Sequence, residues 1–196
     1  MFDEIELGRE FFERLWAIDV QIVKRAAQEK CRFCGGPLHR GDFTRKPRGG
    51  AMAAAGEAFV RRFSLCCGRE GCRKRATPPS VRFLGRRVYV GAAVIVASVV
   101  ALAVSAVSAV RRTTGVSPRT TRRWSRWWRG SFTATAVFVE LSARLLPLVS
   151  RSTLPASLLE RLSGDDATRV HHLLGWLAPI TTTSLPDGSR FVRGLM

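Results

Sequence analysis

The five cysteines of this chain lie in two short segments that can share one metal ion. Cys31 and Cys34 form a C-x-x-C pair, and Cys66, Cys67 and Cys72 follow in a second, basic segment. Four thiolates at such spacings can complete a tetrahedral shell around zinc, and the binding energy of a structural zinc is also folding energy. The pattern therefore predicts a structural zinc site rather than redox chemistry.

Neither a disulfide framework nor a redox dithiol fits the context of these cysteines. Their number, five, is odd, and the first six residues, Met-Phe-Asp-Glu-Ile-Glu, are acidic, unlike a secretory signal. A redox C-x-x-C is expected beside a βαβ pattern, and no such pattern surrounds Cys31. We therefore expect reduced thiols and a cytoplasmic protein.

Two alternatives remain open for the zinc ligands. The favoured set is Cys31, Cys34, Cys67 and Cys72. If residues 62–67 form a strand, side chains alternate, so Cys66 and Cys67 point to opposite faces. Either Cys66 or His39 can replace one ligand, because both side chain types bind zinc.

The two cysteine segments are further apart than in an ordinary zinc ribbon. Thirty-two residues separate Cys34 from Cys67, against about 15 to 20 in the usual spacing. Within this gap, residues 45–56 are small, Gly-rich and basic. They predict a flexible loop that protrudes from a zinc-held hairpin.

Positive charge is concentrated in the middle of the chain. Residues 30–129 contain 22 of the 32 Lys and Arg residues but only three of the 15 Asp and Glu residues, so the net charge of +17 arises entirely there. Such a field attracts a polyanion, most often a nucleic-acid backbone. An anionic membrane surface is the alternative partner.

Residues 113–129 have the pattern of the turn and second helix of a helix-turn-helix. Gly115 can end a helix in the left-handed conformation, Ser117 is a good N-cap, and Pro118 suits the first helical position. At about 100° per residue, arginines occupy one side of this helix and tryptophans the other. The predicted contacts to the major groove of double-stranded DNA are Ser117, Arg119, Thr120, Arg122, Arg123 and Arg126. A helix lying on a membrane surface shares the Trp and Arg composition and is the alternative.

Residues 88–110 carry no charge and are long enough to cross a bilayer. Eleven of these 23 residues are Val, Ile or Leu, and the rest are mostly Ala and Ser, so membrane insertion is weakly driven. The favoured interpretation is a short strand near Val88 followed by buried helices, with small residues such as Ser98 allowing close packing. A membrane-anchored zinc protein spanning at residues 88–110 is the alternative function.

The flanking regions are predicted to be helical scaffolding. In residues 8–29, apolar side chains recur at helical spacing and predict packing against the chain's own core. Residues 131–146, 157–162 and 167–177 are further helix candidates. His171 and His172 are adjacent on the last of these, so they point in different directions and do not predict a metal pair.

No catalytic constellation is predicted. Asp and Glu are missing between Glu70 and Glu140, so the spaced carboxylates of a two-metal nuclease or integrase cannot be assembled around the basic region. Tyr89, the sole tyrosine, lies in an apolar run that suits a strand-cleaving nucleophile poorly. We therefore expect a protein that binds without catalysing.

Two segments resemble parts of a known protein family. The first runs from Cys67 to Cys72 and continues with Arg-Lys-Arg-Ala-Thr-Pro-Pro-Ser, and the second is the later Gly-Val-Ser-Pro-Arg-Thr-Thr-Arg-Arg-Trp. About residues 30–130 resemble the zinc-ribbon and helix-turn-helix regions of bacterial insertion-sequence transposases and their companion proteins. The resemblance implies zinc ligation by Cys31, Cys34, Cys67 and Cys72 and recognition of the ends of a mobile element. In that family a separate acidic-triad domain cuts and joins DNA, and this chain lacks that domain.

Together these observations predict an α+β, mostly α fold in which a zinc-ribbon hairpin joins a helix-turn-helix domain with flanking helices. The expected division is residues 1–29, 30–87, 88–130 and 131–196. The expected function is sequence-specific DNA binding by a nucleoid-associated accessory protein of a mobile genetic element. Its expected partners are double-stranded DNA and a separate transposase or integrase chain, with no small-molecule substrate.

Overall fold

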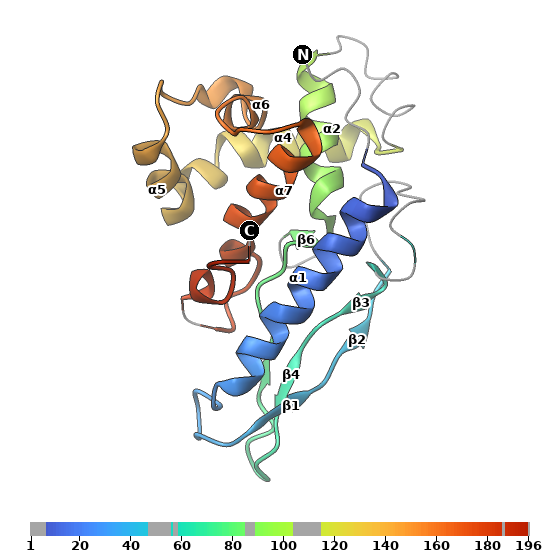
Figure 1. Ribbon diagram of the computed structural model, residues 1–196, viewed down its shortest axis with the longest axis vertical. Coiled ribbons are helices and arrows are strands. Elements are labelled where there is room, and N and C mark those ends of the chain that lie inside the picture. The colour runs from blue at the N-terminus through green and yellow to red at the C-terminus, as the bar shows by residue number, and fades with distance from the viewer. Residues whose placement is uncertain are drawn as a thin grey trace.

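The computed structural model describes residues 7–46, 56, 59–84, 89–103, 115–185 and 187–195. It is an α+β structure with small antiparallel sheets, as predicted, and the largest sheet and most of the helices lie at opposite ends of the molecule (Figure 1). The strands are β1 (Leu38–Arg40), β2 (Phe43–Thr44), β3 (Arg61–Arg62), β4 (Leu65–Cys67), β5 (Arg75–Ala76), β6 (Phe83–Leu84) and β7 (Tyr89–Val90). The α-helices are α1 (Arg9–Gln28), α2 (Gly91–Ala103), α4 (Pro118–Arg129), α5 (Ala136–Arg144), α6 (Ala156–Leu159) and α7 (Asp166–Leu177). Short 3-10 helices are η3 (Phe132–Ala134), η4 (Arg151–Thr153), η5 (Ala178–Thr181) and η6 (Gly188–Phe191).

Helix α1 connects the two ends of the molecule (Figure 1). Its 20 residues correspond to a length of about 30 Å. Phe11, Leu15, Ile18 and Ile22 recur at steps of four, three and four, and all four are buried. This seam lies against the chain's own core, with α1 contacting both β1 and α7, as the periodicity predicted.

Residues 62–67 form parts of two strands instead of one. β3 ends at Arg62 and β4 begins at Leu65, so the continuous strand considered from the sequence is interrupted. Ser64 leaves the ladder because its backbone N–H donates to Asp42 Oδ1 at 3.1 Å and its hydroxyl to the carbonyl of Ala76 at 3.4 Å. These polar contacts replace the strand pairing that a regular residue would make.

Three antiparallel strands in the order β1-β4-β5 form the largest sheet. Within β4 the predicted alternation holds, since Leu65 and Cys67 are buried and Cys66 is half-buried. A separate hairpin pairs β2 with β3, and β6 pairs with β7. Residues 47–55 of the predicted flexible loop lie outside the described residues.

Helices α2 and α4 pack together through a buried hydrogen bond. The indole Nε1 of Trp128 on α4 donates to the hydroxyl of Ser98 on α2 at 3.1 Å. Helix α2 is apolar on all sides, which is typical of a helix buried in a core. Residues 104–114, which include the end of the uncharged run, lie outside the described residues. Among those described, no helix combines the length and the apolar composition needed to cross a membrane.

The carboxyl-terminal third completes the core instead of forming a separate layer. Helix α7 begins one residue before the predicted start and contacts both α1 and α2. The Asp165 side chain caps it by accepting the N–H of Thr168 at 2.7 Å. The longer helix predicted over residues 131–146 is divided at Thr135 into η3 and α5, and residues 157–162 form only the short α6 and a following turn.

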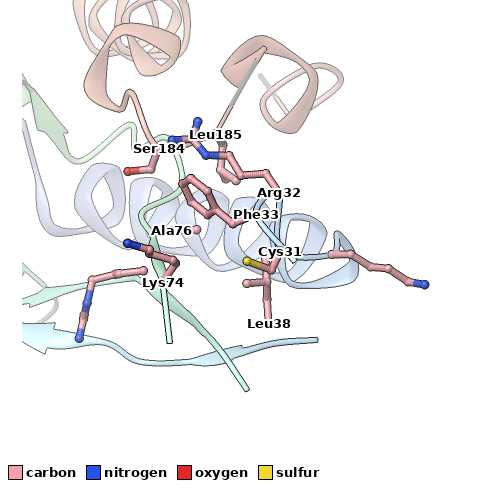
Figure 2. Close-up of a pocket in the computed structure, with 10 residues that line it drawn as sticks. Cys31, Arg32, Phe33, Leu38, Lys74, Ala76, Ser184 and Leu185 are labelled. Atoms are coloured by element: carbon pink, nitrogen blue, oxygen red, sulfur yellow. The ribbon is translucent and has the colours of Figure 1, made fainter. Parts of the chain in front are cut away.

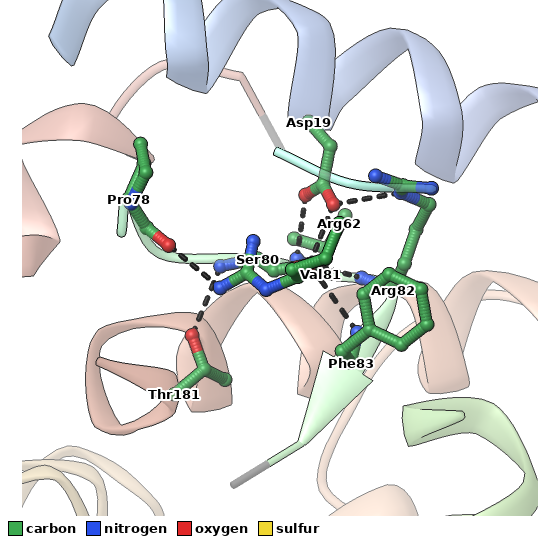
Figure 3. Close-up of polar contacts among 8 residues, drawn as sticks. All are labelled: Asp19, Arg62, Pro78, Ser80, Val81, Arg82, Phe83 and Thr181. Carbon is green, nitrogen blue, oxygen red and sulfur yellow. Dashed lines mark hydrogen bonds and ion pairs between the residues drawn. The ribbon is translucent and has the colours of Figure 1, made fainter. Parts of the chain in front are cut away.

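A buried carboxylate on α1 organises the segment between β5 and β6 (Figure 3). Asp19, only 1% exposed, accepts hydrogen bonds from the Ser80 hydroxyl, the Val81 backbone N–H and the Arg82 Nε. The Arg82 guanidinium is fully buried and stacks near four aromatic rings at 4.5 to 5.7 Å from their centroids, those of Trp16, Phe59, Phe63 and Phe83. Asp19 therefore holds the chain that leads from the sheet to α2.

A second buried guanidinium lies beside this ion pair. Arg62, 5% exposed, donates from Nη2 to the carbonyl of Pro78 at 2.7 Å. Burial lowers the pKa of Arg62 to about 10, and the charge of Asp19 opposes that shift. Both guanidiniums stay protonated at neutral pH, so Asp19 is the counter-charge on which they depend.

We predict that Asp19→Asn lowers the free energy of unfolding by about 3–5 kcal/mol, because it leaves buried guanidinium groups without their counter-charge. Urea denaturation followed by tryptophan fluorescence measures this change. The matched control is Glu13→Gln, which breaks the exposed pair with Arg9 (84% and 60% exposed) and changes stability by about 1 kcal/mol or less. Equal stability losses in the two variants would refute the assigned role of Asp19.

Candidate metal centre and nucleic-acid interface

The first cysteine pair lies in a tight turn directly after α1. The backbone N–H groups of Cys34 and Gly35 both donate to the carbonyl of Cys31, at 3.3 and 2.7 Å. Gly35 has φ +69°, a conformation that glycine adopts without strain. The turn folds back on itself, so both thiols point to the same side as the end of β4.

The second cysteine pair closes the loop between β4 and β5. Cys67 ends β4, and the backbone N–H of Cys72 donates to the carbonyl of Arg69 at 3.2 Å. The Arg69 backbone N–H approaches the Cys67 sulfur at 3.4 Å. Gly71, with φ +78°, supplies the turn before Cys72.

The four predicted cysteines meet in one cluster, here called the cysteine cluster (Cys31, Cys34, Cys67 and Cys72). Their sulfur atoms all lie within 4.8 Å of one another, with Cys31 to Cys72 at 3.8 Å and Cys34 to Cys67 at 3.4 Å. Tetrahedral zinc with Zn–S bonds of ~2.3 Å separates its sulfur ligands by about 3.8 Å. All five cysteines are free thiols. The cluster is therefore positioned to hold a metal ion, and its donor set and spacing fit zinc.

The surroundings of the cluster favour the thiolate, which is the metal-binding form, at Cys31. Hydrogen bonding from the backbone N–H of Phe33 lowers the pKa of the Cys31 thiol to about 7, and burial opposes this shift. Gly36 lies against the cluster, because a Cβ at this position would be 3.1 Å from the Cys67 sulfur and 3.4 Å from the Cys34 sulfur. The absence of a side chain there leaves room for the sulfur atoms.

The two alternative ligands lie apart from the cluster. His39 pairs with Cys66 across β1 and β4, and strand alternation directs Cys66 away from the face that carries Cys67. The Cys66 thiol instead contacts the carbonyl of Arg73 at 3.4 Å. In the described part of the chain, the residues close enough to share a metal are the four of the cysteine cluster.

Ser117 and Pro118 take their predicted places at the start of α4, as the N-cap and the first helical residue. Gly115 has φ +65°, the Ser117 hydroxyl accepts the N–H of Thr120 at 3.4 Å, and Pro118 is the first helical residue. Residues 113 and 114 and the end of the preceding helix lie outside the described residues. The local geometry of Gly115, Ser117 and Pro118 is thus as expected from their sequence.

The two faces of α4 differ sharply in burial. Trp124 and Trp128 are 5% and 0% exposed, whereas five arginines are exposed. These are Arg119, Arg122, Arg123, Arg126 and Arg129. Two of the five are engaged: the Arg123 guanidinium hydrogen-bonds to the Tyr89 hydroxyl and lies 5.4 Å from that ring, and Arg129 Nε donates to the carbonyl of Ser125 at 3.2 Å. Tyr89 was not predicted as part of this surface, and nothing in its apolar sequence context signals the contact.

The cysteine cluster and α4 lie at opposite ends of the molecule (Figure 1). The cluster lies at the end of the sheet formed by β1 and β4, while α4 packs on α2 at the other end. Helix α1, about 30 Å long, spans most of the distance between them. The predicted metal ligands and the predicted DNA contacts therefore lie in two separate regions of the molecule.

Comparisons with known proteins identify no relative. No family model matches the chain, and no curated protein or solved structure matches it. Its function must therefore be argued from its own residues.

We predict that Cys67→Ser abolishes metal binding, because it removes one of four thiolates, whereas Cys66→Ser leaves about one metal ion per chain. Elemental analysis of protein purified without added metal measures the ratio. The two variants make the same chemical change at adjacent positions. A difference in metal content between them therefore cannot come from a general effect of losing a thiol. Metal retained by Cys67→Ser, or lost equally from both, would refute the assignment of the cysteine cluster.

Proposed function

We propose that this chain is a zinc-dependent protein that binds double-stranded DNA with sequence specificity and performs no chemistry itself. The observation that carries the proposal is the arginine face of α4. The side chains of Arg119, Arg122 and Arg126 are exposed, and their guanidinium groups make no hydrogen bond or ion pair with other described residues. Guanidinium groups held outward in this way are ready for a polyanion.

The shape of α4 supports contact with a duplex groove. An α-helix with its side chains is about 10–12 Å across and fits the major groove, which is about 12 Å wide. Arginine can donate two hydrogen bonds to one guanine edge, which gives sequence discrimination as well as charge. Because Trp124 and Trp128 anchor the opposite face, the helix can present the arginines without rotating.

The two hydroxyl residues at the start of α4 take a different role from the arginines. Ser117 and Thr120 hydrogen-bond to each other at 3.0 Å, and Ser117 also caps the helix. We infer that they position a phosphate at the helix amino terminus, where backbone N–H groups and the helix dipole favour an anion. Arg123 can contact DNA with the other arginines only if its hydrogen bond to the Tyr89 hydroxyl breaks.

Zinc in the cysteine cluster would stabilise the other basic end of the molecule. Arg69, Arg73 and Lys74 are exposed on the loop that carries Cys72, next to the cluster. We infer that zinc holds this loop rigid, so that its cations can track a DNA backbone without the entropy loss of ordering it. The metal has a structural role in this proposal.

The resemblance to insertion-sequence proteins gives the proposed context. In this proposal the chain recognises the ends of a mobile element, and a separate transposase or integrase chain cuts and joins the DNA. The charge pattern supports the division of labour, since the sequence has no Asp or Glu between Glu70 and Glu140 to bind catalytic metal ions near α4.

We predict that Arg122→Ala with Arg126→Ala weakens binding to a selected duplex by about 30-fold or more, because two contacts of about 1–3 kcal/mol each are lost. The duplex is obtained by selection from a random library, and fluorescence anisotropy gives the affinity. The matched control is Arg9→Ala with Arg144→Ala, which removes the same charge from exposed surface pairs elsewhere. Affinity of the wild type should also fall steeply between about 50 and 200 mM salt.

Two results would overturn this proposal. One is an equal loss of DNA affinity in the two double variants, which would mean that the arginines of α4 contribute only through the net charge of the protein. The other is a library selection that enriches no sequence while binding stays strong, which would remove sequence specificity.

A further inference from the structure

Phe33 stands out because its ring is exposed beside the cysteine cluster. Its side chain is 57% exposed, and among the described residues it is the one aromatic among the large exposed apolar side chains. The hydrogen bonds of the turn between Cys31 and Cys34 do not involve this ring, since they are made by the backbone and by the Arg69 guanidinium, which donates to the carbonyl of Cys34 at 2.7 Å. The exposed ring leaves an aromatic surface on which a flat group can stack.

Cations from two distant segments surround this ring (Figure 2). Arg32 lies with its guanidinium carbon 4.6 Å from the ring centroid, and Lys74 has its ammonium nitrogen 5.9 Å from it. Four of the ten residues that line the hollow next to the ring are cationic: Lys30, Arg32, Lys74 and Arg75. No acidic residue lines it.

The cations nearest the ring are available to an anion. Lys30, Arg32 and Lys74 are exposed, whereas Arg75 is engaged with the carbonyl of Gly41 at 2.7 Å. The acidic neighbour of Lys30 in sequence, Glu29, is paired with Arg190 at 3.1 Å. The electrostatic potential around Phe33 is therefore positive, and the cations that produce it are exposed to solvent.

The form of this hollow selects the class of ligand. Its volume of about 10 Å³ is too small to enclose a small molecule, so the ligand must lie on the surface. An exposed ring flanked by cations fits a flat aromatic group joined to an anion, which describes a nucleotide. Bases inside a duplex hide their faces by stacking on one another, so only an unpaired base can stack on Phe33.

We propose that Phe33 is a stacking platform for one unpaired base of single-stranded DNA, with Lys30, Arg32 and Lys74 holding the adjacent phosphates. This rests in part on the proposed function, because α4 at the other end of the molecule would hold the duplex from which the single strand extends. The chain would then bind a junction between duplex and single-stranded DNA in preference to either alone.

The test compares three DNA probes of defined structure by fluorescence anisotropy: a short oligothymidine, a blunt duplex of the selected sequence, and the same duplex with a single-stranded extension. Phe33→Ala is expected to weaken binding to the oligothymidine about 10-fold, as expected for loss of one stacked base, and to leave the blunt duplex unchanged. Phe33→Trp is expected to restore binding. The matched control is Leu146→Ala, which removes an 84% exposed apolar side chain elsewhere and should change nothing.

A spectroscopic readout separates stacking from a loss of structure. An oligonucleotide with one 2-aminopurine base should lose fluorescence when that base stacks on Phe33, and the signal should return in Phe33→Ala. The metal content of Phe33→Ala should equal that of the wild type, because the side chain is mostly exposed to solvent and supplies no metal ligand. Unchanged oligothymidine affinity in Phe33→Ala, or equal losses for single strand and duplex, would overturn the proposal.

The outcomes also distinguish this inference from the proposed function. Single-strand binding that depends on Phe33, without duplex binding by the wild type, would keep the platform and refute the role of α4. Duplex binding that depends on Arg122 and Arg126, together with single-strand binding that is unchanged in Phe33→Ala, would support the role of α4 and refute the stacking platform. A preference for RNA over DNA of the same sequence would refute the assignment of single-stranded DNA as the ligand.

Discussion

A single buried carboxylate, Asp19, connects the sheet end of the molecule to its helical end. It accepts three hydrogen bonds from the segment between β5 and β6, and that segment leads into β6, β7 and α2. A buried ion pair of this kind contributes little net stability compared with apolar packing, but removing one partner is costly. Its effect is to define one position for the Arg82 segment relative to α1. The surfaces at both ends of the molecule depend on that position.

The cysteine cluster is tied to the same framework through α1. Cys31 follows the helix within three residues of its end, and β1, which starts after the first cysteine turn, packs against α1. A metal ion bound by the cluster would therefore stabilise the end of α1 as well as the small sheet. Strands of two or three residues gain little from their own pairing, so a metal ion that crosslinks the cysteines would add stability that the small sheet lacks.

Sequence reasoning located the local features that depend on residues close together in the chain. Cysteine spacing indicated the four thiols that meet in the cluster, and the capping residues located the start of α4. The tryptophan and arginine sides of α4 followed from helical periodicity alone. The sequence did not reveal the break between β3 and β4, where the Ser64 N–H donates to Asp42, 22 residues earlier in sequence. Contacts of that range leave no periodic trace in the sequence.

The sequence by itself determined which residues are chemically competent: the cysteines, the arginine-rich helix and the apolar seam of α1. Only the tertiary structure decided which of them share a site. It brought Cys67 rather than Cys66 to the cluster, joined Arg123 to Tyr89, and left Phe33 exposed among cations from a distant loop. The physical reason is that residue type and local spacing fix side-chain direction within one element. The distance between elements depends instead on core packing and on buried polar contacts such as those of Asp19.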